Sequence, residues 1–358
     1  MAERPQPEAA GTARLAALPS PSRRPPRPNP VVGVALVLGG IVAVAIALGV
    51  LTRVTAEIRV ILSLVGLGAA YSGLGLLAKA RYGPSTTIGT KLAAVWVTLV
   101  VGGAVVADFL PLKEAEDASK TFLEPIRATP DLFSRHPLGT DDQGLDILGG
   151  LLYGSRVSLV VGIGAVAIGV IVGGLLGVMS AYFRGAFDRA VNILVTSALA
   201  FPPLVLLLAV AAVLPRNTRN IALALALLTI PSYVRLARAN ALVLAQKEFV
   251  LAARAAGASN GRIILRELVP GVVAPLLSFA FIAVSIVIVA EASLSFLGLS
   301  IPRPKPTLGN MIATGQNRFE TIPHLVFIPA TFLFLVVLSL NRLGEEARRR
   351  FDPKDSKL

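Results

Sequence analysis

Apolar runs long enough to cross a membrane alternate with short charged segments along most of this sequence. The hydrocarbon core of a bilayer is about 30 Å thick and needs roughly 20 apolar helical residues to cross it. The pattern therefore predicts an all-α fold, a polytopic transmembrane helical bundle of about eight helices. They are expected near Val31–Leu51, Val60–Ala78, Leu92–Leu110, Leu159–Ala181, Val191–Leu214, Ile221–Leu236, Val272–Leu294 and Leu325–Leu340.

The composition agrees with a membrane as the main solvent. Hydrophobic residues make up 54% of the 358 residues and charged residues 15%, and the mean hydropathy is +0.72. This apolar content exceeds what one soluble core needs. The sequence contains no cysteine, which excludes disulfides, thiolate metal sites and cysteine nucleophiles.

The formal net charge of +13 lies between the apolar runs and not along one amphipathic face, so we expect no nucleic acid partner. Positive residues near the ends of membrane segments are retained on the cytoplasmic side. The bases occupy alternate loops, which predicts cytoplasmic N- and C-termini, and the long segment 112–156, predicted to lie outside, is mainly acidic. The predicted inside segments carry Lys79, Arg81 and Lys91, then Arg184 and Arg189, then Arg235–Arg266, then Arg342 to the end.

Residues 1–30 are basic and rich in proline, and we expect a disordered cytoplasmic tail there. A cleaved secretory signal peptide is the alternative. The apolar run Val31–Leu51 is longer than the core of a typical signal peptide and is soon followed by other apolar runs. This favours a retained membrane helix.

Residues 240–270 form a polar segment between two predicted membrane helices. Within it, Glu248–Ala256 is predicted to form a short helix that ends at Gly257 as a turn or C-cap. Its many alanines give it a small surface, which permits docking into a groove on another protein. The alternative is an ordinary interfacial helix that lies on the membrane.

A second short helix is predicted to follow in the same segment. Ser259 or Asn260 is placed to cap it, and Arg262–Leu268 is expected to form it. Pro270 is expected to end it, because proline lacks a backbone N–H. The segment is therefore predicted to be a helix–turn–helix.

The stretch AARAAG at residues 252–257, with Pro270 thirteen residues after Gly257, resembles the EAA motif of ABC importer permeases. In that family the motif is the coupling helix that docks into the nucleotide-binding subunit. Leu251 replaces the leading Glu of the motif, which removes one acidic contact. The resemblance implies a role in ATPase coupling for Glu248, Phe249, Ala252, Ala253, Arg254, Gly257, Ala258 and Ser259.

Three other segments resemble the second permease subunit of dipeptide and oligopeptide transporters (DppC/OppC-like): His136–Gly162, Glu291–Ile312 and Asn341–Pro353. In the first segment Leu145 stands where an Arg is commonly found, so any ion pair of that Arg would be absent. The residues of the first segment that match are Gly139, Thr140, Asp141, Gly144, Asp146, Tyr153, Gly154 and Arg156.

The resemblance covers about residues 136–358 and implies a type I ABC importer permease fold that works by alternating access. The implied partners are a second permease subunit (DppB/OppB-like), two ABC ATPase subunits, an extracytoplasmic solute-binding protein and membrane lipid, and no cofactor is implied. The first two helices are additional to the family. We therefore divide the chain into the tail 1–30, an additional transmembrane hairpin 31–80, a first core helix and extracytoplasmic loop 81–135, the permease core 136–350 with the coupling loop 240–270, and a cytoplasmic tail 351–358.

Several polar or helix-breaking residues inside the apolar runs need an explanation. The carboxylate of Glu291 would cost a few kcal/mol at the centre of a membrane helix, so we expect it either to be satisfied and to fix its helix or to contact the solute. Pro202, Pro203 and Pro231 remove backbone donors and predict kinks, which serve gating or packing. The charges at Asp188 and Arg189, and at Glu345 with Arg348 and Arg349, are expected to be solvated.

These features predict a transmembrane permease subunit of an ATP-driven importer for di- or oligopeptides in a bacterial cytoplasmic (inner) membrane. The sequence contains no GxxxxGK[ST] phosphate loop, HExxH or GxSxG motif, so we expect a non-catalytic subunit whose partners hydrolyse ATP. One alternative is an ABC permease for nickel, an oligosaccharide or an iron-carrying compound. Others are a channel or ion-coupled carrier, which would show paired intramembrane charges or an inverted repeat, and a structural or sensory subunit.

Overall fold

The computed structural model describes residues 30–46 and 88–351, except 113, 132, 133 and 304, together with positions 62, 65, 66, 69, 72, 73, 76 and 77. The tail 1–29, most of the second helix of the predicted hairpin and residues 352–358 lie outside this part. The described residues are predominantly helical and include no β-strand, only an isolated bridge between Thr140 and Asp146. The all-α prediction is confirmed.

Five described helical segments are long and apolar enough to span a membrane. Gly89–Phe109 contains α4 (Ile88–Val106) and the short turn η2 (Ala107–Phe109). Ile147–Phe183 contains α5 (Ile147–Ile168), η4 (Gly169–Gly173) and α6 (Gly174–Phe183). Thr218–Leu244 is α9. Asn260–Phe296 contains α11 (Asn260–Arg262), η5 (Ile263–Leu268) and α12 (Val269–Phe296). His324–Arg350 lies within α14 (His324–Phe351).

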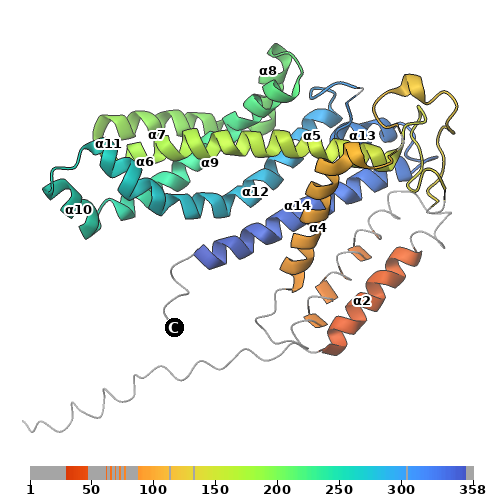
Figure 1. The fold of residues 1–358 in the computed structure, drawn as a ribbon, viewed down its shortest axis with the longest axis horizontal. Coiled ribbons are helices and arrows are strands. Elements are labelled where there is room, and N and C mark those ends of the chain that lie inside the picture. The colour runs from red at the N-terminus through yellow and green to blue at the C-terminus, as the bar shows by residue number, and fades with distance from the viewer. Residues whose placement is uncertain are drawn as a thin grey trace, which may run out of the picture.

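A sixth span would be formed by α7 (Gly185–Ala200) and α8 (Pro203–Val213) together, although the two helices meet at 91°. The span predicted at Val191–Leu214 is thus divided into two helices, and the break lies at the kink that Pro202 and Pro203 predict. Pro202 and Pro203 explain the break, because Phe201 and Pro202 take extended backbone conformations and Pro203 begins a new helix. In Figure 1, α8 stands out from the side of the bundle.

Pro231, in contrast, lies inside α9 without breaking it. The hydroxyl of Thr229 donates to the Ala165 carbonyl of α5 at 3.0 Å and lies 3.0 Å from the Ala226 carbonyl. The bond to Ala165 attaches this part of α9 to α5, whereas Ala226 lies within α9 itself. Opposite it lies η4, a π-helical turn whose Gly169 and Gly173 let the two helices approach closely: a methyl group on Gly173 would lie 2.6 Å from the Ile230 carbonyl oxygen.

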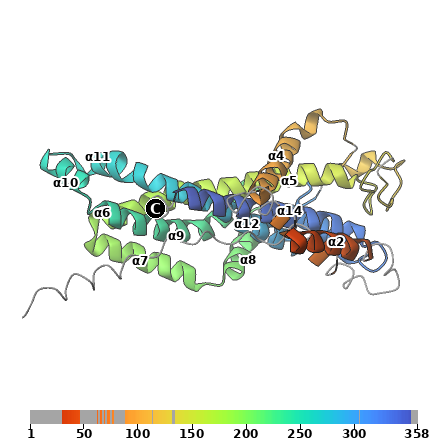
Figure 2. The same cartoon turned by 90° about the horizontal axis from the view of Figure 1, so that it is seen from below.

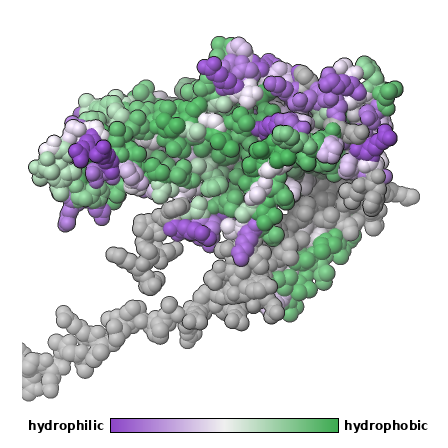
Figure 3. Space-filling view, viewed as in Figure 1, coloured by the Kyte–Doolittle hydropathy of each residue, from purple (hydrophilic) through white to green (hydrophobic). Residues whose placement is uncertain are grey.

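The core of the bundle is made of apolar side chains from α5, α6, α9 and α12. Tyr233, Leu225, Leu268 and Ile288 are fully buried there. On the outer surface the same helices expose apolar residues, as expected where lipid or another apolar subunit replaces water. Figure 3 shows this as an apolar band between more polar ends.

Two parts of the molecule lie at opposite ends of the bundle (Figure 1). At one end is the elbow, which we define as residues 248–262 and which contains α10 (Glu248–Ala255) and α11. At the other is the loop end, which we define as residues 107–146 with α13 (Leu308–Gln316) and which includes the turn η3 (Ala118–Lys120). Figure 2 confirms that these parts remain at opposite ends when the molecule is turned.

Before the core, α2 (Pro30–Ala45) contributes a shorter apolar helix. It packs closely against the described part of the segment 72–77, since a methyl group placed on Gly73 would lie 2.6 Å from the Gly33 carbonyl oxygen. Close packing through glycine is what the glycine-rich sequence of the predicted hairpin indicates. The assignment of 31–80 as an additional hairpin stays a prediction.

Candidate functional site

The first helix of the elbow ends as its sequence predicts. Gly257 has a φ of +78°, a left-handed conformation that favours glycine. Its N–H donates to the Arg254 carbonyl and the N–H of Ala258 donates to the Ala253 carbonyl, both at 3.0 Å. This pair of bonds is a Schellman motif, which satisfies the free carbonyls at a helix end and reverses the chain.

The elbow is attached to the bundle through few side chains. Val250 is fully buried, and Ala253 and Ala258 pack against the core. The rest of α10 faces outward, including the apolar side chains of Phe249, 44% exposed, and Leu251, 55% exposed. Exposed apolar and alanine surface at the tip of a polar segment is characteristic of a surface that another protein or the membrane covers.

All eight residues that the sequence assigns to coupling lie on this elbow. Those with exposed side chains or backbone are Glu248, Phe249, Ala252, Arg254, Gly257 and Ser259. Ala253 and Ala258 form its inner surface. Leu251, which replaces the Glu of the motif, points outward and enlarges the exposed apolar surface.

The second helix of the elbow does not end at Pro270, and this prediction is wrong. From Asn260 the chain continues through the π-helical turn η5 into α12, as one helical segment of 37 residues that reaches Phe296. Pro270 is the second residue of α12 and follows this π-helical turn. The wider π-helical turn before it accommodates the proline without a break.

The helix α6 holds the elbow through Tyr182, a residue that sequence reasoning missed. Its hydroxyl donates to the Asn260 side-chain oxygen at 2.8 Å, and the guanidinium of Arg254 lies 4.9 Å from the centre of its ring. Tyr182 thus contacts both helices of the elbow. The available signal was an aromatic residue at the end of an apolar run, next to basic Arg184.

Asp188 is not the solvated charge that the sequence indicates. Arg238 of α9 donates to both of its carboxylate oxygens, at 2.6 and 2.7 Å, and Ser180 and Asn192 also donate to it. The side chain of Asp188 is 18% exposed. This bidentate pair joins α6, α7 and α9 next to the elbow. Glu345, in contrast, is 56% exposed and lies 3.4 Å from Arg342, as expected for a solvated charge.

Glu291 is fully buried and belongs to a hydroxyl network in α12. It accepts hydrogen bonds from Ser158 of α5 at 2.9 Å, from Ser295 at 2.9 Å and from Ser300 at 3.0 Å. Thr307, which caps α13, lies 2.7 Å from the Ser295 hydroxyl. The network joins α5, α12 and α13, which matches the expectation of a satisfied carboxylate that fixes its helix.

The helix α5 begins at Ile147, earlier than the predicted start at Leu159 and before the predicted end of the outer segment at residue 156. Its polar first turns are satisfied inside the protein: Asp146 caps the helix by accepting from the Gly149 N–H at 2.7 Å, and Arg156 donates to the Ala104 carbonyl at 2.6 Å. Asp146 also contacts the buried His136 at 3.0 Å, and the other ring nitrogen of His136 lies 3.1 Å from Glu124.

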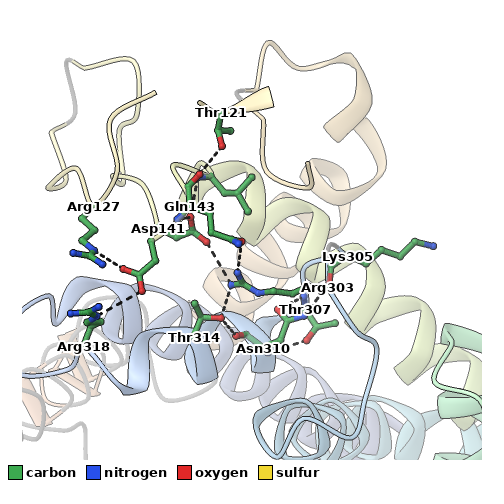
Figure 4. Close-up of polar contacts among 12 residues, drawn as sticks. Thr121, Arg127, Asp141, Gln143, Arg303, Lys305, Thr307, Asn310, Thr314 and Arg318 are labelled. Atoms are coloured by element: carbon green, nitrogen blue, oxygen red, sulfur yellow. Dashed lines mark hydrogen bonds and ion pairs between the residues drawn. The ribbon is translucent and has the colours of Figure 1, made fainter. Parts of the chain in front are cut away.

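Within the loop end, charged side chains fasten residues 127–146 to α13 and its flanking segments (Figure 4). Arg303 donates to Gln143 at 2.8 Å and to Thr314 at 2.5 Å, and lies 3.6 Å from Asp141. The neighbouring Asp142 pairs with Arg127 at 2.7 Å and lies 4.0 Å from Arg318. Residues 127–146 and α13 are thereby joined by ion pairs and hydrogen bonds.

The turn at Glu114 is stabilised in its ionised form. Burial opposes the charge, but hydrogen bonds from the backbone N–H groups of Asp117 and Glu116, together with nearby Lys120, lower the pKa of Glu114 below its usual value. The backbone carbonyl of Glu114 also accepts from the Asp146 N–H at 2.9 Å. This turn therefore supports the start of α5.

The residues predicted to belong to the path or its gates do not form one cluster with the elbow. Pro202 and Pro203 lie at the exposed bend between α7 and α8, Pro231 is buried inside α9, and Glu291 is buried in α12. The bend at Pro202 and Pro203 and the satisfied environment of Glu291 are observed. Their part in a path or gate stays a prediction.

Known proteins with similar sequences agree with this architecture. Residues 169–354 match the family model described as binding-protein-dependent transport system inner membrane component. The glutathione transport system permease protein GsiD of Pectobacterium atrosepticum is 34% identical over 262 residues, 73% of this chain and 86% of the relative. The dipeptide transport system permease protein DppC of Alkalihalophilus pseudofirmus is 33% identical over 264 residues, 74% of this chain and 86% of the relative. GsiD of Escherichia coli O157:H7 is 37% identical over 262 residues, 73% of this chain and 85% of the relative.

The family model covers more than half of the chain, and the relatives align with nearly three quarters of it. The match includes both helical segments that flank the elbow, and the resemblance seen in the sequence is confirmed. The chain belongs to the family of binding-protein-dependent transport system inner membrane components, the multi-pass permeases of ABC transporters.

Proposed function

We propose that this permease carries short peptides, of the size of di- and oligopeptides, into the cell. The relatives are named as glutathione and dipeptide permeases, and both names describe short peptides. The chain forms the path with a second permease, receives solute from an extracytoplasmic binding protein and does not itself hydrolyse ATP. Two partner ATPases supply the energy.

The elbow is the docking site for one ATPase, and the observation that carries this assignment is its geometry. A Schellman turn at Gly257 projects a short helix from the end of the bundle, and that helix exposes Phe249, Leu251 and Ala252. The elbow end, including its basic residues Arg254 and Arg262, lies on the cytoplasmic side. The loop end then faces the binding protein, and both chain termini are cytoplasmic.

The absence of cysteine from the sequence makes the docking directly testable. Ala252→Cys in the assembled transporter is expected to cross-link to a single cysteine placed in the groove of the ATPase. The matched control is Leu99→Cys in the apolar α4, 62% exposed, which is expected to give no such product. An equal yield of ATPase cross-link from both positions, or none from Ala252→Cys in an active complex, would contradict the docking site.

The cargo is tested by uptake of labelled dipeptide into proteoliposomes that contain the complete transporter and its binding protein. ATP-dependent uptake is expected, with competition by unlabelled glutathione or tripeptide. Uptake of nickel, an oligosaccharide or an iron-carrying compound without peptide uptake would show that the peptide assignment is wrong, while leaving the ATPase docking site untouched.

A further inference from the structure

The two longest membrane segments of the described chain are joined by polar bonds near both ends. Each of these segments, Ile147–Phe183 and Asn260–Phe296, has 37 residues. At the elbow, the Tyr182 hydroxyl donates to Asn260 at 2.8 Å. Toward the loop end, the Ser158 hydroxyl donates to Glu291 at 2.9 Å. Between these bonds the contacts are largely apolar, for example from Gly162 to Ile288 and from Gly174 to Leu276.

The two bonds differ in their surroundings. Ser158 and Glu291 are buried, with 1% and 0% exposure, and Glu291 has two further hydroxyl donors. Tyr182 is 9% exposed, whereas Asn260 lies on the surface at the first turn of α11. The bond at the elbow, between Tyr182 and Asn260, therefore depends on one hydroxyl. From α6, Tyr182 contacts the elbow at two residues, Arg254 and Asn260.

We propose that Tyr182 is a positioning residue that makes the elbow move α5–α6 together with α12. The elbow is continuous with α12 through the backbone, so a displacement by the ATPase reaches α12 directly. It reaches α6 through the hydroxyl bond to Asn260 and the stacking of Arg254. Loss of the hydroxyl weakens this link, so that a smaller part of the elbow's displacement reaches α6 and part of the ATPase cycle no longer rearranges the bundle.

This inference rests on the proposed docking of the elbow and predicts a specific defect. Tyr182→Phe keeps the ring beneath Arg254 and removes the bond to Asn260. A single hydrogen bond shifts an equilibrium by about 2- to 10-fold, so we expect the amount of solute transported per ATP hydrolysed to fall within that range. Asn260→Ala is expected to give the same defect, and the double variant is expected to be no worse than either single variant, because all three lack the same bond.

The chain offers a matched control in Tyr233. It is fully buried, and its hydroxyl has no hydrogen-bond partner among the residues that the structure describes. Tyr233→Phe therefore makes the same chemical change without the loss of a bond. We expect an unchanged ratio of transport to ATP hydrolysis in this variant.

The measurement is made on the complete transporter in proteoliposomes, with solute uptake and ATP hydrolysis recorded together and with the Ala252→Cys cross-link as a check on docking. A retained cross-link with a lowered ratio in Tyr182→Phe, and not in Tyr233→Phe, supports the proposal. Equal ratios in the two phenylalanine variants, or additive defects of Tyr182→Phe and Asn260→Ala, overturn it. In either case, a retained cross-link shows that the proposed docking is unaffected. If Ala252→Cys alone, without a change at Tyr182, gives no cross-link to the ATPase, the docking itself is contradicted.

Discussion

The two ends of the bundle are stabilised in opposite ways. The loop end is held by arginines that bridge to α13 and, through Thr307, by the hydroxyl network around Glu291 of the adjoining α12. The elbow has one fully buried anchor, Val250, and its exposed surface is largely alanine and other apolar side chains. A surface of this kind is stable when a partner covers it. The loop end also exposes apolar side chains, among them Phe122 (87%) and Leu123 (101%). The two ends therefore differ in how they are fastened: the loop end by polar bonds within this chain, and the elbow mainly by apolar contacts, which leaves its outer surface free for the proposed docking.

The largest expected effect comes from removing the buried carboxylate of Glu291, in α12 next to the loop end. Glu291→Ala leaves the hydroxyls of Ser158, Ser295 and Ser300 without their acceptor and opens a cavity, so we expect a loss of stability on the order of 3–5 kcal/mol. The measurement is the apparent Tm of the detergent-purified complex. Glu345→Ala, at a carboxylate that is 56% exposed, serves as the control and is expected to leave the Tm unchanged. A similar Tm for both variants would show that the network does not stabilise the bundle.

A smaller change in stability, with a large loss of transport, is expected at the elbow. Gly257→Val places a β-branched residue at a φ of +78°, which costs about 1–2 kcal/mol. Among the described residues, apart from its chain neighbours, no atom lies within 4 Å of the position of an added Cβ, so within this chain the expected cost comes from the backbone conformation. Transport is expected to fall while the Tm of the complex stays within a few degrees.

Gly257→Asn sharpens the same test. Asparagine tolerates the left-handed conformation better than other side chains, so this variant is expected to keep most of the transport activity. If Gly257→Asn and Gly257→Val were equally inactive, the defect would come from the bulk of a side chain at the ATPase interface and not from the turn.

The smallest effect is expected from the surface ion pairs of the loop end. The Arg303 side chain is 37% exposed, and exposed pairs contribute about 0.2–1 kcal/mol. Arg303→Ala is expected to leave the Tm nearly unchanged and to raise amide hydrogen exchange of residues 141–146 relative to those of α5. Unchanged exchange in this segment would show that Arg303 does not fasten the loop to α13.

The sequence predicts the five long membrane segments of the described core in their order, because hydropathy reports directly which segments lipid accepts. It misplaces the start of α5, since Arg156 and Ser158 read as polar although partners far away in the sequence, Ala104 and Glu291, satisfy them. It also misses the pair of Asp188 with Arg238, whose members are 50 residues apart. Bonds of this range depend on how helices pack and leave no local pattern.

Within the elbow, too, some features are predictable from local sequence and others depend on long-range packing. Its first helix and its turn follow from local rules, since only the preferences of alanine and of Gly257 are needed. The continuation past Pro270 does not, because a π-helical turn is set by the packing of Ile263, Ile264 and Leu268 in the core. Tyr182 is separated from the elbow by some 70 residues of sequence, so only the folded chain brings them together.

The unbroken segment from Asn260 to Phe296 has a mechanical consequence. At 1.5 Å per residue, its 37 residues extend about 55 Å, well beyond an apolar layer of about 30 Å. If the excess of roughly 25 Å projects at the elbow, a tilt of about 10° displaces its tip by roughly 4 Å. Between this tip and the buried Glu291 the chain is helical throughout. A small rotation of the helix within the membrane therefore displaces its tip at the elbow by about the length of a side chain.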